Sequence, residues 1–468
     1  MGKPMTINTC YTVDLKAQIK TDCHEKTGEC LVDDKLMRST SRVCLDALRH
    51  CADLFLRNWD LLKAYPVTAK PGVTHRKRAA DLMVHSTIGH PAMDPDFDRK
   101  FPNMPSYMRR AVISDALGLV SSYMSNHQNW EKLLPAERGS EPSIGYPTHY
   151  ELTFYKQERD LSEIDQGKIY LKLYDGKAWN WYEFRIKPSD ARYIAGLIKH
   201  RKLLSPVVQK IRGKYQVRFS FEEKKTLVPT EKSLDYVILA VDLGINAAAS
   251  WSIMTSDGTV HAKGVIHLPC EEDRLRHMMN RKKMYQQAGK KSHSVYRWVQ
   301  DANRALSIAT TQKLMEIAVL YNADCIVFEY LDRSGSKSGR LKERLHMWRA
   351  NDVQKRVELQ AHRCGMRISR ICAWNTSRLA YDGSGTTDRR SIYHYKHGKK
   401  VYSYSLCTFE SGKQYNCDLS ASMNIGARYF LREYQKASQE VVFPLVPQRT
   451  LNTLLLYVYN GMPRAARV

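Results

Sequence analysis

The sequence predicts an α+β protein of several domains, in which an antiparallel β module is interrupted by a helical module and followed by a mixed α/β domain. Alternating apolar and polar residues mark strands at the start of the chain and again over 146–235. Apolar residues at helical spacing fill 38–145, and nearly continuous apolar strands appear after 236. With 468 residues, the chain is long enough for two or three domains with cores of their own.

The β module comes first, and its second part resumes after the helices. MTINTCYTVDLKAQI alternates as a strand does, so residues 1–37 are assigned to this module. In GKIYLKLYDGKAWNWYEFRI, two alternating runs meet at Asp175-Gly176, which predicts a hairpin. KYQVRFSFEEKK adds another strand, and 146–235 are therefore assigned to the rest of the module.

The helical module is predicted over 38–145. RSTSRVCLDALRHCADLFLRNWDLLKAY carries apolar residues at helical spacing, and PSYMRRAVISDALGLVSSYMSNHQNWEKL starts a second helical block at Pro105. A basic cluster, HRKR, lies between the two blocks.

The mixed α/β domain is predicted from 236 onward. YVILAVDLGI is an almost continuous apolar strand, and a hairpin is expected to turn at Asp257-Gly258. A long basic helical region follows, and then DCIVFEYL, a second buried strand. We assign 236–371 and the helix within 415–440 to this domain, 372–414 to an insertion and 441–468 to a tail of undetermined role.

The charge of the chain indicates a polyanionic partner. The 73 Lys and Arg residues exceed the 48 Asp and Glu residues, which gives a net charge of +25. Nucleic acid is the leading partner class, and an anionic membrane surface is the second. No apolar run reaches the ~20 residues that span a bilayer. The start of the chain has no apolar signal region, and the 11 Cys residues form no CxxC pair, so we expect a cytoplasmic protein.

Three acidic residues stand at the ends of predicted elements. Asp242 closes the strand YVILAVD, Glu329 closes CIVFE, and Asp418 opens the helix of LSASMNIGARYF. Asp242 could simply begin a turn, and Asp418 could be a helix N-cap. A carboxylate at the end of so apolar a strand as that of Glu329 must be paired, hydrated or bound to metal. Together, the three could hold two Mg²⁺ ions ~3.5–4 Å apart at one sheet edge, as in phosphodiester hydrolysis.

The chain resembles a known family at these residues. VDLGIN, IVFEYL and NCDLSASMNIG, in this order, are similar to the three RuvC motifs of the TnpB nucleases and the miniature type V CRISPR effectors. LHMWRANDVQKRVELQAHRCGMRISRICAWNTSR and FPNMPSYMRRAVISDALGLVSSYMSNHQNW resemble further family segments, so the resemblance extends with gaps from about residue 38 to 432. It implies a wedge-like β-barrel with an inserted helical recognition lobe, followed by an RNase H-like RuvC domain. A small target-binding ribbon would be inserted before the third motif.

The resemblance implies a Mg²⁺-dependent, RNA-guided DNA endonuclease of prokaryotic type. Its partners would be a guide RNA and target double-stranded DNA, and the protein would read a short flanking motif. Asp242, Glu329 and Asp418 would be the catalytic, metal-binding acids. Two alternatives stay open: an RNA-guided DNA-binding repressor without cleavage, and an RNA-independent resolvase or transposase of RNase H fold. A CRISPR or a transposon origin of the guide, and a monomer or a homodimer, are equally open.

The ribbon departs from the family pattern at its metal ligands. The resemblance places Ala380 and Gly383 at the first cysteine pair, and Glu410 replaces the partner of Cys407 in the second. A structural zinc needs four ligands, so we expect no zinc. His394 and His397 with Cys407 and Cys417 would be an alternative set, but their spacing matches no known zinc module. An aromatic core is expected instead, formed by Tyr393, Tyr395, Tyr402, Tyr404 and Phe409.

Basic residues elsewhere are candidates for contact with nucleic acid. Residues 333–370 hold eleven Lys or Arg against three acids, which favours phosphate contact, and Arg349 lies in this stretch. Arg378, in NTSR, would lie near the entrance of the active site if the resemblance holds. In the helical lobe, the candidates for gripping a guide–target heteroduplex are Arg76, Lys77, Arg78, Arg109 and Arg110.

Overall fold

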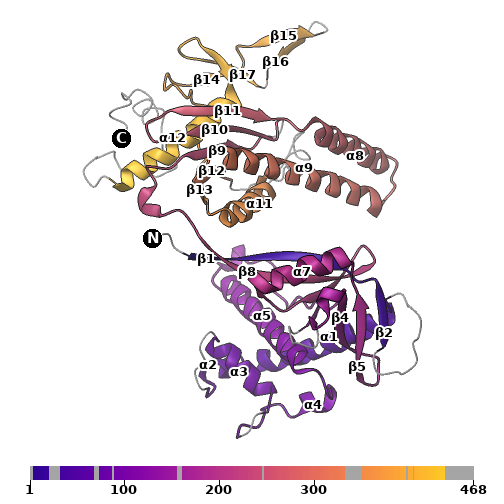
Figure 1. Ribbon diagram of the computed structural model, residues 1–468. Coiled ribbons are helices and arrows are strands. Elements are labelled where there is room, and N and C mark those ends of the chain that lie inside the picture. The colour runs from indigo at the N-terminus through magenta and orange to yellow at the C-terminus, as the bar shows by residue number, and fades with distance from the viewer. Residues whose placement is uncertain are drawn as a thin grey trace. The chain divides into compact units, whose positions relative to one another are not determined.

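The chain forms two compact units, each described here by itself. A computed structural model describes residues 4–20, 32–67, 73–86, 89–154, 161–244, 247–331, 350–396, 399–403 and 405–437. One unit comprises Asn8–Glu223, and the other comprises Met1–Ile7 with Lys224–Val468. Figure 1 labels the helices and strands of both.

Two antiparallel sheets form the β part of the first unit. The larger has the order β1-β8-β7-β3, with β6 also paired to β8, and the smaller has the order β2-β5-β4. The predicted hairpin is confirmed as β4 and β5, which turn through Gly176 at φ +101°. The strands are β1 (Pro4–Asp14), β2 (Ala17–Lys20), β3 (Leu152–Thr153), β4 (Lys168–Tyr174), β5 (Trp179–Arg185), β6 (Lys202–Leu203), β7 (Val207–Ile211) and β8 (Lys214–Thr226).

The N-terminal strands connect the two sheets. Between β1 and β2, the backbone N–H of Leu15 donates to the carbonyl of Tyr215, and that of Lys16 donates to Arg185, both at 2.9 Å. The described strands nevertheless do not close into a barrel. A barrel needs a continuous ladder around its circumference, and β3 and β6 are only two residues long each. The wedge-like barrel expected from the resemblance is therefore not confirmed in the part of the chain that is described.

The helices of the first unit pack as their sequence pattern predicts. In α1, Cys44, Leu48, Cys51 and Phe55 repeat at helical spacing and are all buried. α1 packs against α5, and both contribute to one core with the two sheets. The helices are α1 (Asp34–Arg57), α2 (Leu61–Ala64), α3 (His75–Val84), α4 (Asp96–Lys100), α5 (Ser106–Glu131) and α7 (Pro188–His200), with the 3₁₀ turns η1 (Pro135–Glu137) and η2 (Ile164–Gln166).

A five-stranded mixed sheet is the centre of the second unit. Its order is β11-β10-β9-β12-β13, in which β12 runs parallel to both β9 and β13, and β10 runs antiparallel to β9 and β11. The predicted hairpin at Asp257-Gly258 joins β10 to β11. The strands are β9 (Ile238–Asp242), β10 (Ala249–Met254), β11 (Val260–Ile266), β12 (Cys325–Tyr330) and β13 (Arg367–Cys372), preceded by the turn η3 (Thr230–Lys232).

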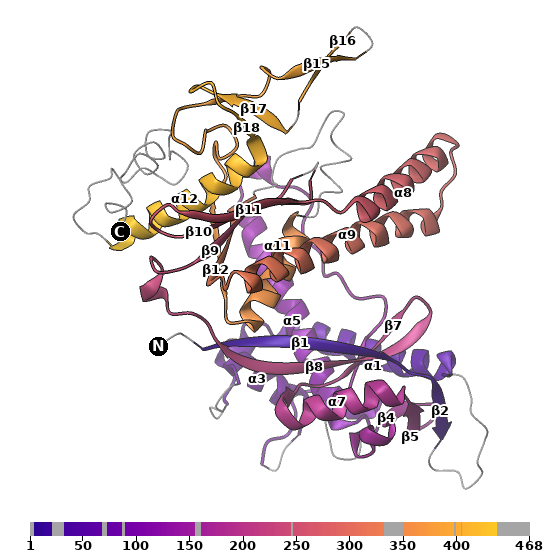
Figure 2. The ribbon, with the colours of Figure 1, turned by 45° about the horizontal axis from the view of Figure 1, so that its top comes forward.

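Helices cover both faces of this sheet (Figure 2). Ile238 and Ala240 of β9 belong to a core with α12 (Cys417–Ala437). Their neighbours Leu239 and Val241 belong to a second core with α9 (His293–Leu320) and α11 (Ala350–Arg363). Because successive side chains of a strand point to opposite faces, a strand covered on both sides must be apolar throughout. The helix α8 (Pro269–Gln287) packs along α9.

The predicted insertion lies between β13 and α12. It contains a three-stranded sheet of order β14-β17-β18 and a separate hairpin, β15–β16. Its strands are β14 (Thr387–Asp388), β15 (Tyr393–Lys396), β16 (Lys399–Tyr402), β17 (Leu406–Phe409) and β18 (Gln414–Asn416). Among the described helices of the whole chain, none is long and apolar enough to cross a membrane.

Candidate active site

Asp242 and Glu329 lie next to each other at one edge of the mixed sheet. Their strands are parallel, and Val241 is paired with Phe328, so each acid comes directly after a paired residue. Asp242 shares its face of β9 with Ile238 and Ala240, two residues of the core under α12. By the same alternation, Glu329 shares its face of β12 with Cys325 and Val327 of that core. Both carboxylates therefore face α12.

The first turn of α12 carries the third acid, and this acid is not the helix cap. The side-chain oxygen of Asn416 accepts hydrogen bonds from the backbone N–H groups of Asp418 and Leu419, both at 3.0 Å. These are two of the donors that a helix leaves unsatisfied at its start. Asn416 fills the capping role, so the carboxylate of Asp418 is available for other chemistry.

Gly426 allows α12 to lie close to the sheet. A Cβ at this position would overlap the Sδ atom of Met254 and would lie 3.3 Å from the Cβ of Ala240. Met254 and Ala240 are buried residues of β10 and β9. The glycine therefore sets the distance between the helix that carries Asp418 and the strand that carries Asp242.

The three carboxylates influence one another electrostatically. Burial raises the pKa of Asp242 well above its usual value, and the charges of Glu329 and Asp418 raise it further. Burial also raises the pKa of Glu329, against the opposing effects of a hydrogen bond from Thr376 and the charge of Arg428. The pKa of Asp418 is raised by burial and lowered in part by Arg389. The three acids predicted from the sequence are thus brought together, in a place where negative charge is costly.

Three residues of this site were not predicted from the sequence. The hydroxyl of Thr376 donates to the Oε1 atom of Glu329 and so fixes that carboxylate. Arg428 is buried, and its guanidinium donates to the carbonyl of Cys372 at 2.8 Å. Arg389, just after β14, acts on the pKa of both Asp242 and Asp418. Of these three residues, Arg428 alone has a signal in the sequence that could have predicted it, because it is an arginine within the apolar stretch MNIGARYF.

The donor set suits Mg²⁺ better than a softer metal. Three carboxylates converge, and oxygen ligands are those that Mg²⁺ prefers. Among the described residues, no three His, Cys, Asp or Glu side chains are placed closely enough to hold an ion by themselves. A Mg²⁺ ion usually takes only one or two carboxylates and completes its shell with waters and substrate phosphates. The residues present therefore fit a magnesium site that is completed by its substrate.

The ribbon is held together by packing and hydrogen bonds. Ala380 and Cys407, at two of the positions aligned with zinc ligands, are buried in one small cluster with Phe409 and Cys417. The carboxylate of Glu410, at a third position, accepts hydrogen bonds from the backbone N–H and the hydroxyl of Thr386, both at 2.7 Å. Packing and hydrogen bonds thus hold together the parts of the ribbon around Ala380, Cys407 and Glu410, which a zinc ion would link in the family pattern.

The expected aromatic core of the ribbon is largely wrong. Phe409 belongs to the core, but Tyr393, Tyr395 and Tyr402 are exposed on the β15–β16 hairpin. This hairpin forms a two-stranded sheet of its own, and the rings of Tyr395 and Tyr402 pack against that of Tyr393 at its surface. The rings that do pack on the cluster are those of Tyr381 and Tyr415. Tyr404 and His397 lie outside the described residues, whereas His394 is exposed on β15.

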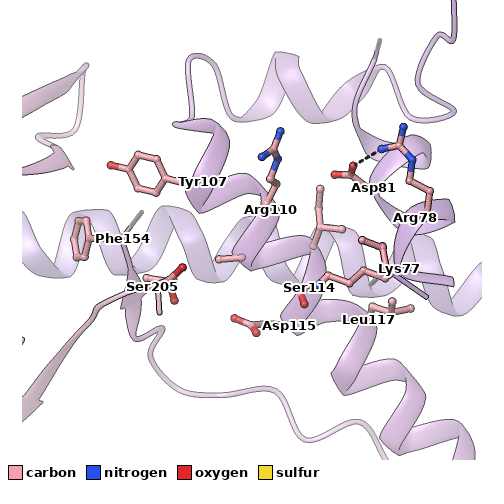
Figure 3. Close-up of a pocket in the computed structure, with 14 residues that line it drawn as sticks. Lys77, Arg78, Asp81, Tyr107, Arg110, Ser114, Asp115, Leu117, Phe154 and Ser205 are labelled. Carbon is pink, nitrogen blue, oxygen red and sulfur yellow. Dashed lines mark hydrogen bonds and ion pairs between the residues drawn. The ribbon is translucent and has the colours of Figure 1, made fainter. Parts of the chain in front are cut away.

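The basic residues predicted in the helical lobe divide into two groups. Lys77, Arg78 and Arg110 line a pocket of 440 Å³ together with Asp115 (Figure 3). Arg78 is also paired with Asp81 at 3.2 Å, and Arg76 lies 4.5 Å from the ring centroid of Trp59. Arg109 is instead committed inside the unit, where its guanidinium pairs with Asp98 and bonds to the Nδ1 atom of His85 at 2.8 Å.

The remaining predicted cations belong to the second unit. Arg378 is exposed between β13 and β14. Arg349 lies outside the described residues. Of the described arginines in the basic stretch 333–370, several have partners within the unit, which weakens the argument for phosphate contact there. Arg356 pairs with Asp352 at 3.0 Å, Arg370 with Glu358 at 2.7 Å, and Arg367 bonds to the carbonyl of Val228 at 2.5 Å.

Comparisons with known proteins give one family model and a set of solved structures. The model of the Aq_aa04 family matches residues 18–175. A structure described as the Cas12f1-sgRNA-target DNA complex aligns with 90% of this chain and 98% of its own, at 12% identity and a TM-score of 0.30. The Cas12i1 R-loop complex after target DNA cleavage aligns with 84% of this chain and 66% of its own, at 8% identity and a TM-score of 0.41. For the AacC2c1-sgRNA binary complex the shares are 82% and 68%, at 10% identity and a TM-score of 0.36. No curated protein matches the chain.

Proposed function

We propose that this protein is an RNA-guided DNA endonuclease that hydrolyses phosphodiester bonds at Asp242, Glu329 and Asp418. The observation that supports the chemistry best is the convergence of these acids from β9, β12 and the start of α12. Structural roles do not account for them, since Asn416 caps α12, and since burial raises the pKa of both Asp242 and Glu329. Acids kept together against their mutual repulsion are typical of a functional site.

Asp242, Glu329 and Asp418 would hold magnesium together with waters and substrate phosphate oxygens, and the metal would supply activation of the attacking water and neutralisation of the charge on the phosphate. In the reaction, the water oxygen bonds to phosphorus, the bond from phosphorus to one sugar oxygen breaks, and the released sugar oxygen takes up a proton. Thr376 holds Glu329 in place, and the guanidinium of Arg389 supplies positive charge beside Asp242 and Asp418. A cation at that position favours the approach of a phosphate group.

Two further features support guidance by RNA. The net charge of +25 favours a polyanionic partner much larger than a scissile phosphate. The three motifs VDLGIN, IVFEYL and NCDLSASMNIG resemble those of RNA-guided nucleases in order and spacing. A resolvase or transposase without RNA would leave the large unit Asn8–Glu223 without a role. A repressor without cleavage would not need three intact acids.

RNA that co-purifies with the protein tests the guided part of the proposal. A defined small RNA with one variable end supports it, whereas the absence of a bound RNA points to the resolvase or transposase. The recovered RNA should then direct cutting of a matching DNA in Mg²⁺.

Alanine substitution at Asp242, Glu329 or Asp418 tests the chemistry. Each variant should lose cleavage while it keeps the RNA and binds target DNA, because each loses a metal ligand and no guide contact. Glu316→Ala is the matched control, since Glu316 is an exposed acid on α9 that pairs with Lys313 at 2.7 Å. Robust cutting by the Glu329 variant would refute the assignment, and loss of target binding by all three would favour a structural role.

A further inference from the structure

A helical hairpin of the second unit carries an excess of positive charge, since the acids of α8 all lie at its start, where Asp273 pairs with Arg276 at 3.5 Å. It consists of α8, a short turn and the first part of α9, and it extends away from the mixed sheet (Figures 1 and 2). Between residues 274 and 300 the sequence contains no Asp or Glu. The same stretch contains the cations Arg274, Arg276, Arg281, Lys282, Lys283, Lys290, Lys291 and Arg297. We call residues 274–298 the basic arm.

The turn of the basic arm is encoded by its capping residues. At the end of α8, Gly289 adopts φ +67°, and the backbone N–H of Lys290 donates to the carbonyl of Tyr285 at 2.9 Å. A glycine in this conformation is the common way to end a helix. Ser292 then caps α9 by accepting a hydrogen bond from the N–H of Val295 at 3.5 Å. The arm is therefore a defined hairpin.

Packing alone does not explain why the arm exists. α8 has no buried residue along its length, and it is supported by α9, where Val295 and Val299 are buried. An isolated pair of helices with so little buried apolar surface adds little to the stability of the domain. The accumulated positive charge further opposes its folding. A ligand that neutralises the charge accounts for both features.

Aromatic rings lie beneath the cations of the arm. Trp298 and Tyr296 are 41% and 40% exposed. The guanidinium of Arg281 lies 4.8 Å from the ring centroid of Trp298, and the ammonium of Lys282 lies 5.5 Å from that of Tyr296. Exposed aromatic rings beside cations are the recurring means of binding unpaired nucleic-acid strands, because a base stacks on the ring while a phosphate pairs with the cation.

We propose that the basic arm binds an unpaired DNA strand. A duplex keeps its bases stacked inside and offers nothing to Trp298 and Tyr296. The arm belongs to the same unit as the three acids, so a strand held there is retained by the domain proposed to cut it. This inference rests on the proposed function, because a guide RNA that pairs with one strand of a DNA duplex leaves the other strand unpaired.

Fluorescence anisotropy with the full chain in EDTA tests the proposal without cleavage. The main probe is a labelled oligothymidylate of about 16 nucleotides, a length within the range of single-strand sites. The variant Arg281→Gln/Trp298→Ala should weaken its binding by about tenfold or more, since each stacked base contributes ~1–3 kcal/mol. Trp298→Phe should retain most of the affinity because the ring is kept. The slope of log affinity against log salt concentration should become shallower by about 0.7 for each phosphate contact that is lost.

The matched control is Lys313→Gln, on the same helix but paired with Glu316 outside the arm, and it should bind like the wild type. Four results would overturn the inference. The affinity of Arg281→Gln/Trp298→Ala for oligothymidylate could stay within twofold of the wild type, or the variant could lose as much affinity for a blunt duplex as for oligothymidylate. The wild-type protein could strongly prefer oligouridylate, or could bind anionic phospholipid vesicles instead of the oligonucleotide. Failure of the proposed function would be seen separately, as cleavage that persists after substitution of the acids.

Discussion

Substitution of Gly426 tests how α12 positions Asp418. In an exposed helix, Gly→Ala stabilises by about 1 kcal/mol because alanine loses less conformational freedom. At Gly426 the added methyl group would overlap the Sδ atom of Met254, and overpacking of a core costs about 1–3 kcal/mol. The difference gives a net destabilisation of roughly 1 kcal/mol for Gly426→Ala. The sign of the effect is therefore opposite to that of an ordinary helical position.

Hydrogen exchange of the amides of α12, followed by mass spectrometry, measures this effect locally. A loss of 1 kcal/mol corresponds to roughly fivefold faster exchange. The matched control is Gly118→Ala in α5, where a Cβ would meet nothing within 4 Å, and it should slow exchange in its own helix. Because Asp418 lies in the first turn of α12, Gly426→Ala should also slow cleavage.

A double-mutant cycle separates the overlap from other effects. Met254→Ala removes the obstructing atom, although it destabilises the core on its own. In that background, Gly426→Ala should become neutral or stabilising, with a coupling of about 2 kcal/mol. Effects of the two substitutions that add within roughly 0.5 kcal/mol, or a Gly426→Ala variant as stabilised as Gly118→Ala, would refute the close packing of α12 described above.

Substitutions at four further positions test the site and the ribbon. Burial and neighbouring charge raise the pKa of Asp242, so between its usual and its raised pKa the folded protein binds more protons than the unfolded chain, and the metal-free protein loses stability as pH rises through that interval. Asp242→Asn should therefore raise Tm in EDTA at pH 7, by about 2–4 °C for each kcal/mol gained. A lower Tm would contradict the repulsion among the acids. Asn416→Ala should destabilise α12 by about 1 kcal/mol and slow cleavage, because it removes the cap of the helix. Asn416→Asp should keep the stability of α12 and the cleavage rate near those of the wild type, and hydrogen exchange of the α12 amides measures the stability of each variant. Arg389→Gln should raise the pKa of Asp418 further and move the acidic limb of the pH–rate profile to higher pH, and an unchanged limb would place Arg389 away from the acids. Cys407→Ser should cleave at nearly the wild-type rate, and elemental analysis should find no stoichiometric zinc; one zinc per chain that this substitution removes would contradict the metal-free ribbon.

The sequence was sufficient for features that depend on one segment at a time. The continuous apolar strands that end in Asp242 and Glu329 required burial on both faces, and the mixed sheet provides it. The capping role considered for Asp418 belongs to Asn416, because the helix begins one residue earlier than the acid.

Features that depend on distant segments were not predictable in this way. The charge of Arg389, in the ribbon, acts on the pKa of Asp242 and Asp418, and no local pattern in the sequence encodes this long-range effect. The alternating tyrosines of β15 and β16 resembled a core pattern, but their hairpin forms a separate two-stranded sheet on which these side chains are exposed. The barrel was inferred from the resemblance alone, and strands as short as β3 and β6 do not continue its ladder.

The N-terminal strands β1 and β2 belong to two different sheets, and this has a consequence for how the chain folds while it is being synthesised. Leu15 bonds to Tyr215, and the Oδ1 atom of Asp14 accepts from the side chain of Gln216 at 2.6 Å, so partners some 200 residues apart must meet. At ~5–20 residues per second, the ribosome needs roughly 10–40 s to make the later strand after the earlier one. During that interval the first strand of the chain has an unpaired edge, which is a site for aggregation. The helices of the lobe are made in the meantime, and they can fold from local contacts while the strand waits.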